Sequence, residues 1–393
     1  MADEKKSPLS ELPFVKSLDD LSNSARKIST RSNATGIQTG LFTLASSLAA
    51  VVLALAICAV LLWVTGKNPW EAYSTIIKTG TEGDKLLEML KRATPLIFSA
   101  TAVAVGFKMN LFNIGVEGQY LFAALMAGTI GSRVSLPAPL HILFILIVAM
   151  VAGALWASIA AALKVGRGVH EVISTIMLNY VALSVIQWLF ENFFRDNDAE
   201  GLNVKTKLLP ASGRMPDIVK DRLGGMFLVA LFVVFLYWVL VFKSRFGFRL
   251  RASGLNPGAA RTSGIDANKM IVLSLLVSGA IAGLVAMQSV LGEIYAYGPN
   301  ATPTQLGFLG IAVALLGRHH PIGIVAAALL FGFLDSTSAQ LQLADIPSSI
   351  VKLIQAITVL TVVIINEATI RWLNKRTAER TAATLIHRAE VAA

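Results

Sequence analysis

The chain has 393 residues, of which 55% are hydrophobic and 15% are charged, and its mean hydropathy is +0.66. These values exclude a water-soluble globular domain and indicate an integral membrane protein. The formal net charge of +10 is explained by membrane orientation, so no nucleic-acid partner is inferred. The single cysteine, Cys58, excludes an intrachain disulfide.

Ten charge-free or nearly charge-free runs predict transmembrane helices, because a hydrocarbon core of about 30 Å needs roughly 20 apolar residues per helix. The runs lie at about 41–65, 93–107, 113–132, 140–163, 171–193, 224–242, 270–291, 302–317, 321–340 and 349–370. The predicted fold class is therefore an all-α integral membrane protein with about ten transmembrane helices. The second run is short and continues almost directly into the third, so a single broken crossing over 93–132 remains an alternative.

Three parts are expected along the chain: an N-terminal segment 1–40, a transmembrane domain 41–370 and a C-terminal tail 371–393. The first part is either an amphipathic surface helix or disordered, and the tail is basic, alanine-rich and predicted to be helical. A removable signal peptide is not expected, because no short apolar core with a cleavage site precedes the first run.

The loops predict that both termini are cytoplasmic. With the N-terminus inside, 21 Lys and Arg residues fall in inner segments and 13 in outer segments. The positive-inside rule favours this orientation. The outer loop 195–222 carries basic residues that are largely matched by acidic ones, whereas the inner segment 243–269 has six basic residues and only Asp266.

A polar interruption, NLFNIGVEGQYLF, occupies 110–122. Backbone that leaves a helix at membrane depth is tolerated only where protein or a water-filled cavity satisfies it. Asn113 is expected to be an N-cap, with Glu117 in the first turn of the next helix, where the dipole favours its charge. The stretch is either a tight inter-helix turn or the wall of a polar path, since an ionisable residue within a span is a functional candidate. Proton or metal coordination is disfavoured, because no second carboxylate or histidine stands at helical spacing.

Further along, a buried amide and a polar inner segment need explanations. Asn179 is expected either to bond between helices or to contact a ligand. Within 244–269, the stretch NPGAARTSGI predicts a short helix with proline at its start, and a plain amphipathic turn on the membrane is the alternative. Arg245, Arg249 and Arg251 are expected to anchor the preceding span to anionic lipid headgroups rather than to contact ATP.

The second half of the chain has an interruption of its own. GEIYAYGPNATPTQLGFLG spans 292–310, in a position that corresponds to the first interruption when the spans are divided five plus five. An odd number of crossings per half requires an inverted repeat, so we expect broken helices near 107–118 and 292–310. Gly279 and Gly283, four residues apart, predict a face for close helix packing. Asp335 is either a cavity group or an outer cap.

Motifs for chemistry are absent from the sequence. No GxxxxGK[ST] phosphate loop occurs, so ATP is not expected to bind this chain, and we expect no enzymatic activity and no catalytic residue. No HxxxH or CxxC spacing indicates a metal site or a cofactor. His319 and His320, before Pro321, are expected in a solvated inner turn.

Five segments in the same order carry a resemblance to a known family. They are FNIGVEGQ (112–119), LKVGRGVHEVISTIMLNYVA (163–182), ASGLNPGAARTSGI (252–265), SGAIAGL (278–284) and GFLGIAVALLGRHHPIGIVAAALLFG (307–332). Together they resemble the permease subunits of bacterial ABC importers of the ribose and branched-chain amino acid superfamily, most closely the nucleoside branch. One departure is Leu309, which stands where an acidic residue is expected.

The resemblance implies a ten-helix permease in the bacterial inner membrane and three kinds of protein partner. These are a cytoplasmic ABC ATPase, a second permease in a heterodimer, and an extracytoplasmic substrate-binding protein. In such a permease a coupling helix docks on the ATPase, and small residues allow another chain to approach closely. We assign this contact to Gly254, Asn256, Ala259, Ala260 and Gly264.

The predicted substrate path alternates aromatic and polar residues, as a flat base and a hydroxyl-rich sugar require. The path is assigned to Phe112, Asn113, Gly115, Glu117, Gln119, Asn179, Gln305 and Phe308. Nucleosides are the favoured substrate, with simple sugars as the alternative. An ion-coupled secondary transporter is a further alternative, but it would usually need an intramembrane carboxylate cluster.

Overall fold

The computed structural model describes residues 49, 51–197, 204–220, 222–343 and 349–392. The predicted N-terminal segment 1–40 lies outside the described residues. The chain divides into two compact units, one formed by Cys58–Val359 and the other by Met1–Ile57 together with Leu360–Ala393. Each unit is described by itself.

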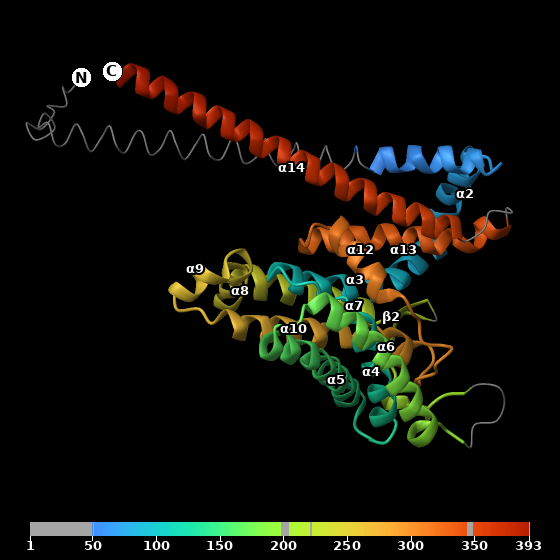
Figure 1. Cartoon of the computed structure of the whole chain (residues 1–393). Coiled ribbons are helices and arrows are strands. Elements are labelled where there is room, and N and C mark those ends of the chain that lie inside the picture. The colour runs from blue at the N-terminus through green and yellow to red at the C-terminus, as the bar shows by residue number, and fades with distance from the viewer. Residues whose placement is uncertain (1–48, 50, 198–203, 221, 344–348, 393) are drawn as a thin grey trace, which may run out of the picture. The chain divides into compact units, whose positions relative to one another are not determined.

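The unit 58–359 is built mainly of helices, as the sequence predicts (Figure 1). Its elements are α2 (Pro69–Gly80), α3 (Gly83–Lys108), α4 (Val116–Gly131), α5 (Ala138–Arg167), α6 (Glu171–Leu189) with the π-helical turn η2 (Phe190–Phe194), the 3₁₀ turn η3 (Ala211–Gly213), α7 (Met226–Trp238) with the π-helical turn η4 (Val239–Lys243), α8 (Arg245–Leu255), α9 (Pro257–Thr262), α10 (Ala267–Gly283), α11 (Met287–Gly292), α12 (Leu306–Leu316), α13 (Pro321–Leu343) and the start of α14 (Ser349–Ala392).

A small antiparallel hairpin departs from the all-α prediction. Strand β1 (Asp217–Val219) pairs with β2 (Leu223–Gly224), with Asp217 opposite Gly224. The sequence of this loop is charged and lacks an alternation of β-branched and polar residues, so periodicity does not reveal the strands.

Five helical segments are long and apolar enough to cross a membrane, among the residues that the structure describes. They are Ala138–Arg167, Glu171–Phe194, Met226–Lys243, Ala267–Gly292 and Pro321–Leu343. Shorter apolar helices occupy Val51–Val64, Leu306–Leu316 and Ser349–Ile365. The membrane class is thus supported, whereas the count of ten spans and the inverted repeat stay predictions.

The other unit contains the start of helix Val51–Val64 and the greater part of α14. Because α14 runs without interruption from Ser349 to Ala392, the predicted helical tail is confirmed. The boundary expected at residue 370 stays a prediction.

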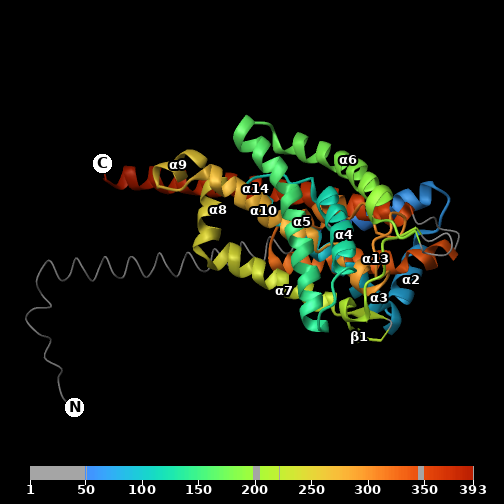
Figure 2. The same ribbon diagram turned by 90° about the horizontal axis from the view of Figure 1, so that it is seen from below.

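Helices α5 and α10 lie side by side and cross with their backbones in contact (Figures 1 and 2). A Cβ atom added at Gly153 would lie 2.2 Å from the carbonyl oxygen of Gly279, and one added at Gly283 would lie 2.1 Å from that of Ala149. Glycine is the residue that permits such an approach. The close-packing face predicted for Gly279 and Gly283 is therefore confirmed.

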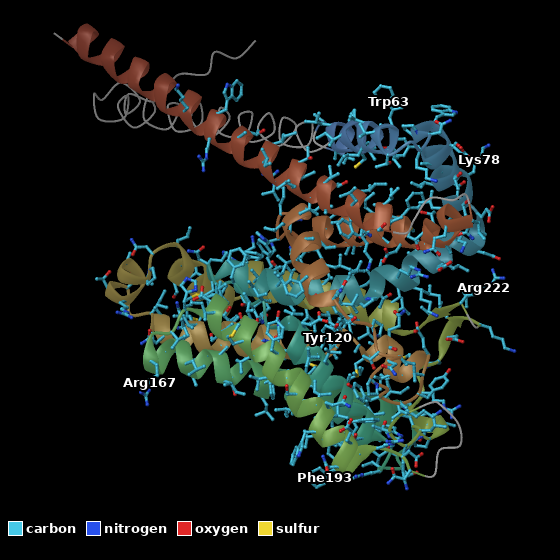
Figure 3. All side chains as sticks on the ribbon, turned by 45° about the vertical axis from the view of Figure 1, so that its right-hand side comes forward. Trp63, Lys78, Tyr120, Arg167, Phe193 and Arg222 are labelled. Carbon is cyan, nitrogen blue, oxygen red and sulfur yellow. The ribbon has the colours of Figure 1, made fainter. Side chains whose placement is uncertain are left out.

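Two irregular segments interrupt the helices where the sequence predicts breaks. The first, residues 109–115, separates α3 from α4, and the second, residues 293–305, separates α11 from α12. Tyr120, one helical turn beyond the first break, lies inside the bundle, whereas Trp63, Arg167 and Phe193 lie at its periphery (Figure 3). Both breaks therefore bring non-helical backbone against the interior of the unit 58–359.

Candidate functional site

The first break is closed by its own buried side chains. Asn113 is 1% exposed, and its amide nitrogen donates to Oε1 of Gln119 at 3.0 Å and to the hydroxyl of Ser278 at 2.8 Å. Its amide oxygen accepts from the backbone N–H of Gly115 at 3.1 Å and from Nε2 of Gln119 at 3.0 Å. Every polar atom of this amide is thus paired within the protein.

The expected N-cap role of Asn113 is corrected by this geometry. Helix α4 begins at Val116 with Gly115 at the N-cap, and no side chain caps it there. Instead, Asn179 of α6 reaches the first turn: its amide oxygen accepts from the N–H of Gly118 at 2.9 Å, and its nitrogen donates to the carbonyl of Ile114 at 3.0 Å. Asn179 therefore forms an interhelical bond, one of its two predicted roles.

Glu117 connects the first turn of α4 with the start of α12. Its carboxylate accepts from the backbone N–H of Gln305 at 2.6 Å and from that of Gly307 at 2.8 Å. The hydroxyl of Tyr120 donates to the same carboxylate at 2.8 Å and also contacts the carbonyl of Pro303 at 3.0 Å. A carboxylate at a helix N-terminus satisfies orphan N–H groups and interacts favourably with the helix dipole.

The first turn of α12 packs closely against α3 and α4. A Cβ atom at Gly307 would lie 2.7 Å from the backbone nitrogen of Glu117, and one at Gly310 would lie 1.9 Å from Oγ of Ser99. The Ser99 hydroxyl donates to the carbonyl of Leu306 at 2.8 Å. This packing fixes the position of α12 relative to the two helices that flank the first break.

On its other side the start of α12 borders a large cavity of about 1110 Å³. The cavity is lined by residues from α3, α11, the second break, α12, α13 and the first turns of α14, together with Arg222: Asp84, Glu88, Lys91, Arg92, Pro95, Arg222, Gln288, Glu293, Pro303, Thr304, Gln305, Leu306, Phe308, Leu309, Ala312, Phe331, Asp335, Lys352, Gln355 and Ala356. The volume of the cavity and its lining of both polar and apolar residues suit a small organic ligand.

Polar groups of the cavity form two sets. One set lies on α13 and α14, where Nε2 of Gln355 donates to the carboxylate of Asp335 at 3.1 Å. The other consists of ion pairs: Glu88 bonds Lys85 and Arg92, each at 2.7 Å, Lys91 lies 3.1 Å from Glu293, and Arg222 pairs with Asp84. Burial opposes ionisation of Glu88, but the hydrogen bonds and charges of Lys85 and Arg92 prevail and hold the pKa of Glu88 below its usual value.

The predicted path residues separate into two groups. Gln305 and Phe308 line the cavity, and Phe308 is 55% exposed. Asn113, Glu117, Gln119 and Asn179 are buried. The half-exposed Phe112 packs edge-on against Phe107 with ring centroids 4.4 Å apart, and Gly115 is buried among Asn113, Gln119 and Thr175. Only the first group has side chains on the cavity surface.

Several cavity residues were not predicted as site residues. Asp335 belongs to the cavity, which decides between its two predicted roles, and Leu309 also lines it. Gln288 and Gln355 were missed. The available signal was a single polar residue within an apolar helix, as at Gln355 in the run 349–370, and this signal alone does not distinguish a ligand contact from an interhelical bond.

The polar segment 244–269 folds into two short helices. Asn256 caps α9 by accepting from the N–H of Ala259 at 3.0 Å, and Pro257 occupies the first helical position, as predicted. The residues assigned to ATPase contact differ in accessibility. Asn256, Ala259 and Gly264 are exposed, whereas Ala260 is 3% exposed. A Cβ atom at Gly254 would lie 2.7 Å from the backbone of Met109, so Gly254 packs against the first break.

Residues 85–363 match the family model described as branched-chain amino acid transport system / permease component. The chain belongs to this permease family. The resemblance predicted from the five segments is thereby confirmed. The chain is 37% identical over 319 residues to the guanosine ABC transporter permease protein NupP of Bacillus subtilis, covering 80% of this chain and 91% of NupP.

Two further permeases are similar over most of the chain. Identity is 33% to the nucleoside ABC transporter permease protein NupB of Lactococcus lactis, covering 79% of this chain and 87% of NupB. It is also 33% to the glucose ABC transporter permease protein TsgB13 of Haloferax volcanii, covering 79% of this chain and 84% of TsgB13. Relatives with this degree of similarity thus differ in the solute that their names give.

Proposed function

We propose that this chain is the permease subunit of an ABC importer and that it forms part of the translocation path for nucleosides. The observation that carries the proposal is the cavity at the start of α12, whose lining combines an exposed aromatic ring with amides and a carboxylate. The names of NupP and NupB support the same class of solute. The chain itself supplies the path, while ATP hydrolysis belongs to a partner chain.

The chemistry of the cavity suits a nucleoside. The ring of Phe308 offers a flat apolar surface for a base, while Gln305, Asp335 and Gln355 offer donors and acceptors for sugar hydroxyls. Since a binding protein would deliver the solute, the cavity needs only rough complementarity.

The buried polar residues have a supporting role in this proposal. Asn113, Gln119 and Asn179 satisfy the backbone of the first break, and Glu117 holds α12 so that Phe308 faces the cavity. Phe112 and Gly115 belong to the same supporting wall. These residues act on the path through α12 and α4 rather than by touching the solute.

The proposed orientation has both termini in the cytoplasm, with α8 and α9 facing the ATPase. Leu255, at the end of α8, is 89% exposed and adds an apolar anchor to the exposed residues Asn256, Ala259 and Gly264. An exposed leucine beside small residues suits docking of another protein surface. A second permease and an extracytoplasmic binding protein complete the proposed assembly.

Uptake of radiolabelled guanosine, ribose and leucine, in cells with and without this chain, tests the substrate class. We expect deletion to remove guanosine uptake and to spare the other two. The name of TsgB13 favours a simple sugar as the second candidate. Loss of ribose uptake with guanosine uptake intact would select that candidate.

Cysteine labelling tests the path. After Cys58 is replaced by serine, cysteines at 305 and 308 should react with a membrane-impermeant thiol reagent, and an excess of guanosine should slow the reaction at least about threefold. Cysteines at 113 and 119 serve as matched controls and should stay unreactive, because their side chains are buried. Reactivity at 113 equal to that at 308 would contradict this division.

Coupling is tested at exposed positions, because a substitution at buried Ala260 would disturb packing as well as docking. Leu255→Asp and Ala259→Arg should reduce copurification of the ATPase at least about tenfold without changing the unfolding temperature of the permease. Arg167→Gln, at an exposed position on α5, is the control. Full ATPase association in both variants would refute the assignment.

A further inference from the structure

A second cavity, of about 590 Å³, lies where the apolar span Met226–Lys243 ends and α8 begins. Its walls come from η4, from the first two turns of α8 and from the turn between α9 and α10. Figure 2 shows α8 connecting the end of α7 with α9 at one end of the bundle. This cavity is separate from the one at the start of α12, since the two share no lining residue.

Four cationic side chains line this cavity: Lys243, Arg245, Arg249 and Arg251. Within the described part of the chain, no carboxylate forms an ion pair with any of them. The one acidic residue of the segment 243–269, Asp266, caps α10 by accepting from the N–H of Lys269 at 3.1 Å. Among the described residues, the four cations of the cavity are therefore not neutralised by ion pairs.

Two cationic groups lie beside the same aromatic ring of the cavity wall. The Arg251 guanidinium lies 5.7 Å and the Lys108 ammonium 5.2 Å from the centre of the Phe242 ring, which is part of the cavity wall. Burial, together with the charge of Arg251, lowers the pKa of Lys108, which follows the end of the span preceding the first break. A bound anion would relieve this repulsion between cations.

The depth of the cavity fits the headgroup layer of a membrane. Lys243 is the last residue of the apolar span, and its ammonium lies 5.3 Å from the ring of Trp238, a pairing typical of the membrane interface. Phe248, which is 62% exposed, and Ile265 place apolar surface beside the cations. Cations and apolar rings together match a headgroup with its attached acyl chains.

We propose that this cavity binds the phosphate group of an anionic membrane lipid. Arg245 and Arg249, both exposed, would hold the phosphate oxygens, since guanidinium groups bind phosphate through paired N–H donors. Phe248 and Ile265 would contact the start of the acyl chains. The site lies beside α9, so an occupied cavity would hold the end of α7 and the start of α8 at the membrane surface.

Native mass spectrometry of the full chain in detergent tests the proposal. Dioleoylphosphatidylglycerol and dioleoylphosphatidylcholine are titrated separately, and inorganic phosphate is added in a third arm with the shift in unfolding temperature as the readout. The variant Arg245→Gln/Arg249→Gln removes two of the cations. Its control, Arg167→Gln/Lys269→Gln, removes the same charge from exposed positions outside the cavity. Arg167 marks the end of α5, at the same end of the bundle as α8 (Figure 3).

We expect the cavity variant to bind phosphatidylglycerol at least about tenfold more weakly than the unchanged chain and the control to stay within about twofold. Phosphatidylcholine should bind weakly to all three. If the cavity variant loses only the shift in unfolding temperature caused by inorganic phosphate and still binds phosphatidylglycerol, the cavity is a site for a soluble phosphate, and the lipid proposal is wrong. Equal losses of phosphatidylglycerol binding in the cavity variant and the control, or unchanged binding in the cavity variant, would overturn the proposal.

Discussion

The two breaks differ in what satisfies their polar backbone. The first, at 109–115, is held by buried amide side chains, with Asn113 and Asn179 at its centre. The second, at 293–305, is held by backbone bonds to the segment 204–220, such as the N–H of Thr206 to the carbonyl of Tyr297 at 2.9 Å, and by side chains of α4, since Glu117 accepts from the N–H of Gln305. Its last residues, Pro303 to Gln305, instead line the large cavity.

This difference shows that a polar interruption need not form the binding surface that it suggests. The amide of Asn113 in the first break is engaged in internal hydrogen bonds. The second break carries more polar residues, and two of them, Thr304 and Gln305, line the cavity. Engagement in internal hydrogen bonds, rather than the number of polar residues, thus separates the two breaks.

Replacing the residue that connects the breaks should have the largest effect. Glu117→Leu removes the acceptor for the N–H groups of Gln305 and Gly307, and we expect about 3–5 kcal/mol less stability and loss of uptake. Thermal unfolding in detergent and guanosine uptake are the measurements. Tyr120→Phe, which removes only one donor to the carboxylate, should cost about 1 kcal/mol. If Glu117→Leu unfolds at the same temperature as the unchanged chain, Glu117 does not stabilise the contact between the two breaks.

A smaller effect should follow from crowding the start of α12 while its hydrogen bonds stay in place. A Cβ atom at Gly310 would overlap Oγ of Ser99, so Gly310→Ala should lower stability by about 1–3 kcal/mol and reduce uptake. Gly292→Ala is a matched control at the end of α11, where an added Cβ meets nothing within 4 Å. Equal unfolding temperatures for the two variants would contradict a fixed position of α12.

The other end of α12 should give a smaller, pH-dependent effect. His319 lies in the turn between α12 and α13, outside the apolar segments, where burial and then the charge of Lys108 lower its pKa from 6.5 to about 4. Because the folded-state pKa lies below the unfolded one, its contribution is full above pH 6.5 and is lost as pH falls through about 4.

We expect His319 to contribute on the order of 2 kcal/mol to the free energy of unfolding above pH 6.5. This is less than the full pKa shift would give, because the side chain keeps some contact with solvent. Unfolding should be followed from pH 7 to pH 4 for the unchanged chain and for His319→Phe, whose ring can still stack on Phe107. The variant should lose less stability over this range. Identical pH profiles would show that His319 is not held neutral.

The sequence predicted the features that depend on neighbouring residues. Glycine and asparagine marked both breaks, the proline at 257 marked the start of α9, and the spacing of Gly279 and Gly283 marked a close helix crossing. It could not show that Glu117 bonds α12, because the two lie 190 residues apart and no local pattern encodes the pairing. For the same reason the sequence could not show that Asp335 and Gln355 line the cavity, because this depends on the packing of α13 and α14.

The solvated turn expected at His319 and His320 was only half correct. His320 is exposed, whereas His319 packs its ring 4.3 Å from that of Phe107 and receives a hydrogen bond from the Tyr237 hydroxyl on its carbonyl at 2.8 Å. Tertiary contacts with α3 and α7 decide this burial, and a run of polar residues cannot reveal them.

The glycine crossing of α5 and α10 has a mechanical consequence. Since the backbones touch at Gly153 and Gly279, neither helix can slide by a residue without driving a side chain into the other's main chain. We therefore expect the two helices to move together, and because only residues 263–266 separate α9 from α10, we expect a displacement of α9 to shift α10 and α5 jointly. Spin labels at Arg167 and Lys269 should keep their separation when ATP binds to the assembled transporter, while a label pair at Lys269 and Phe308 should change its separation.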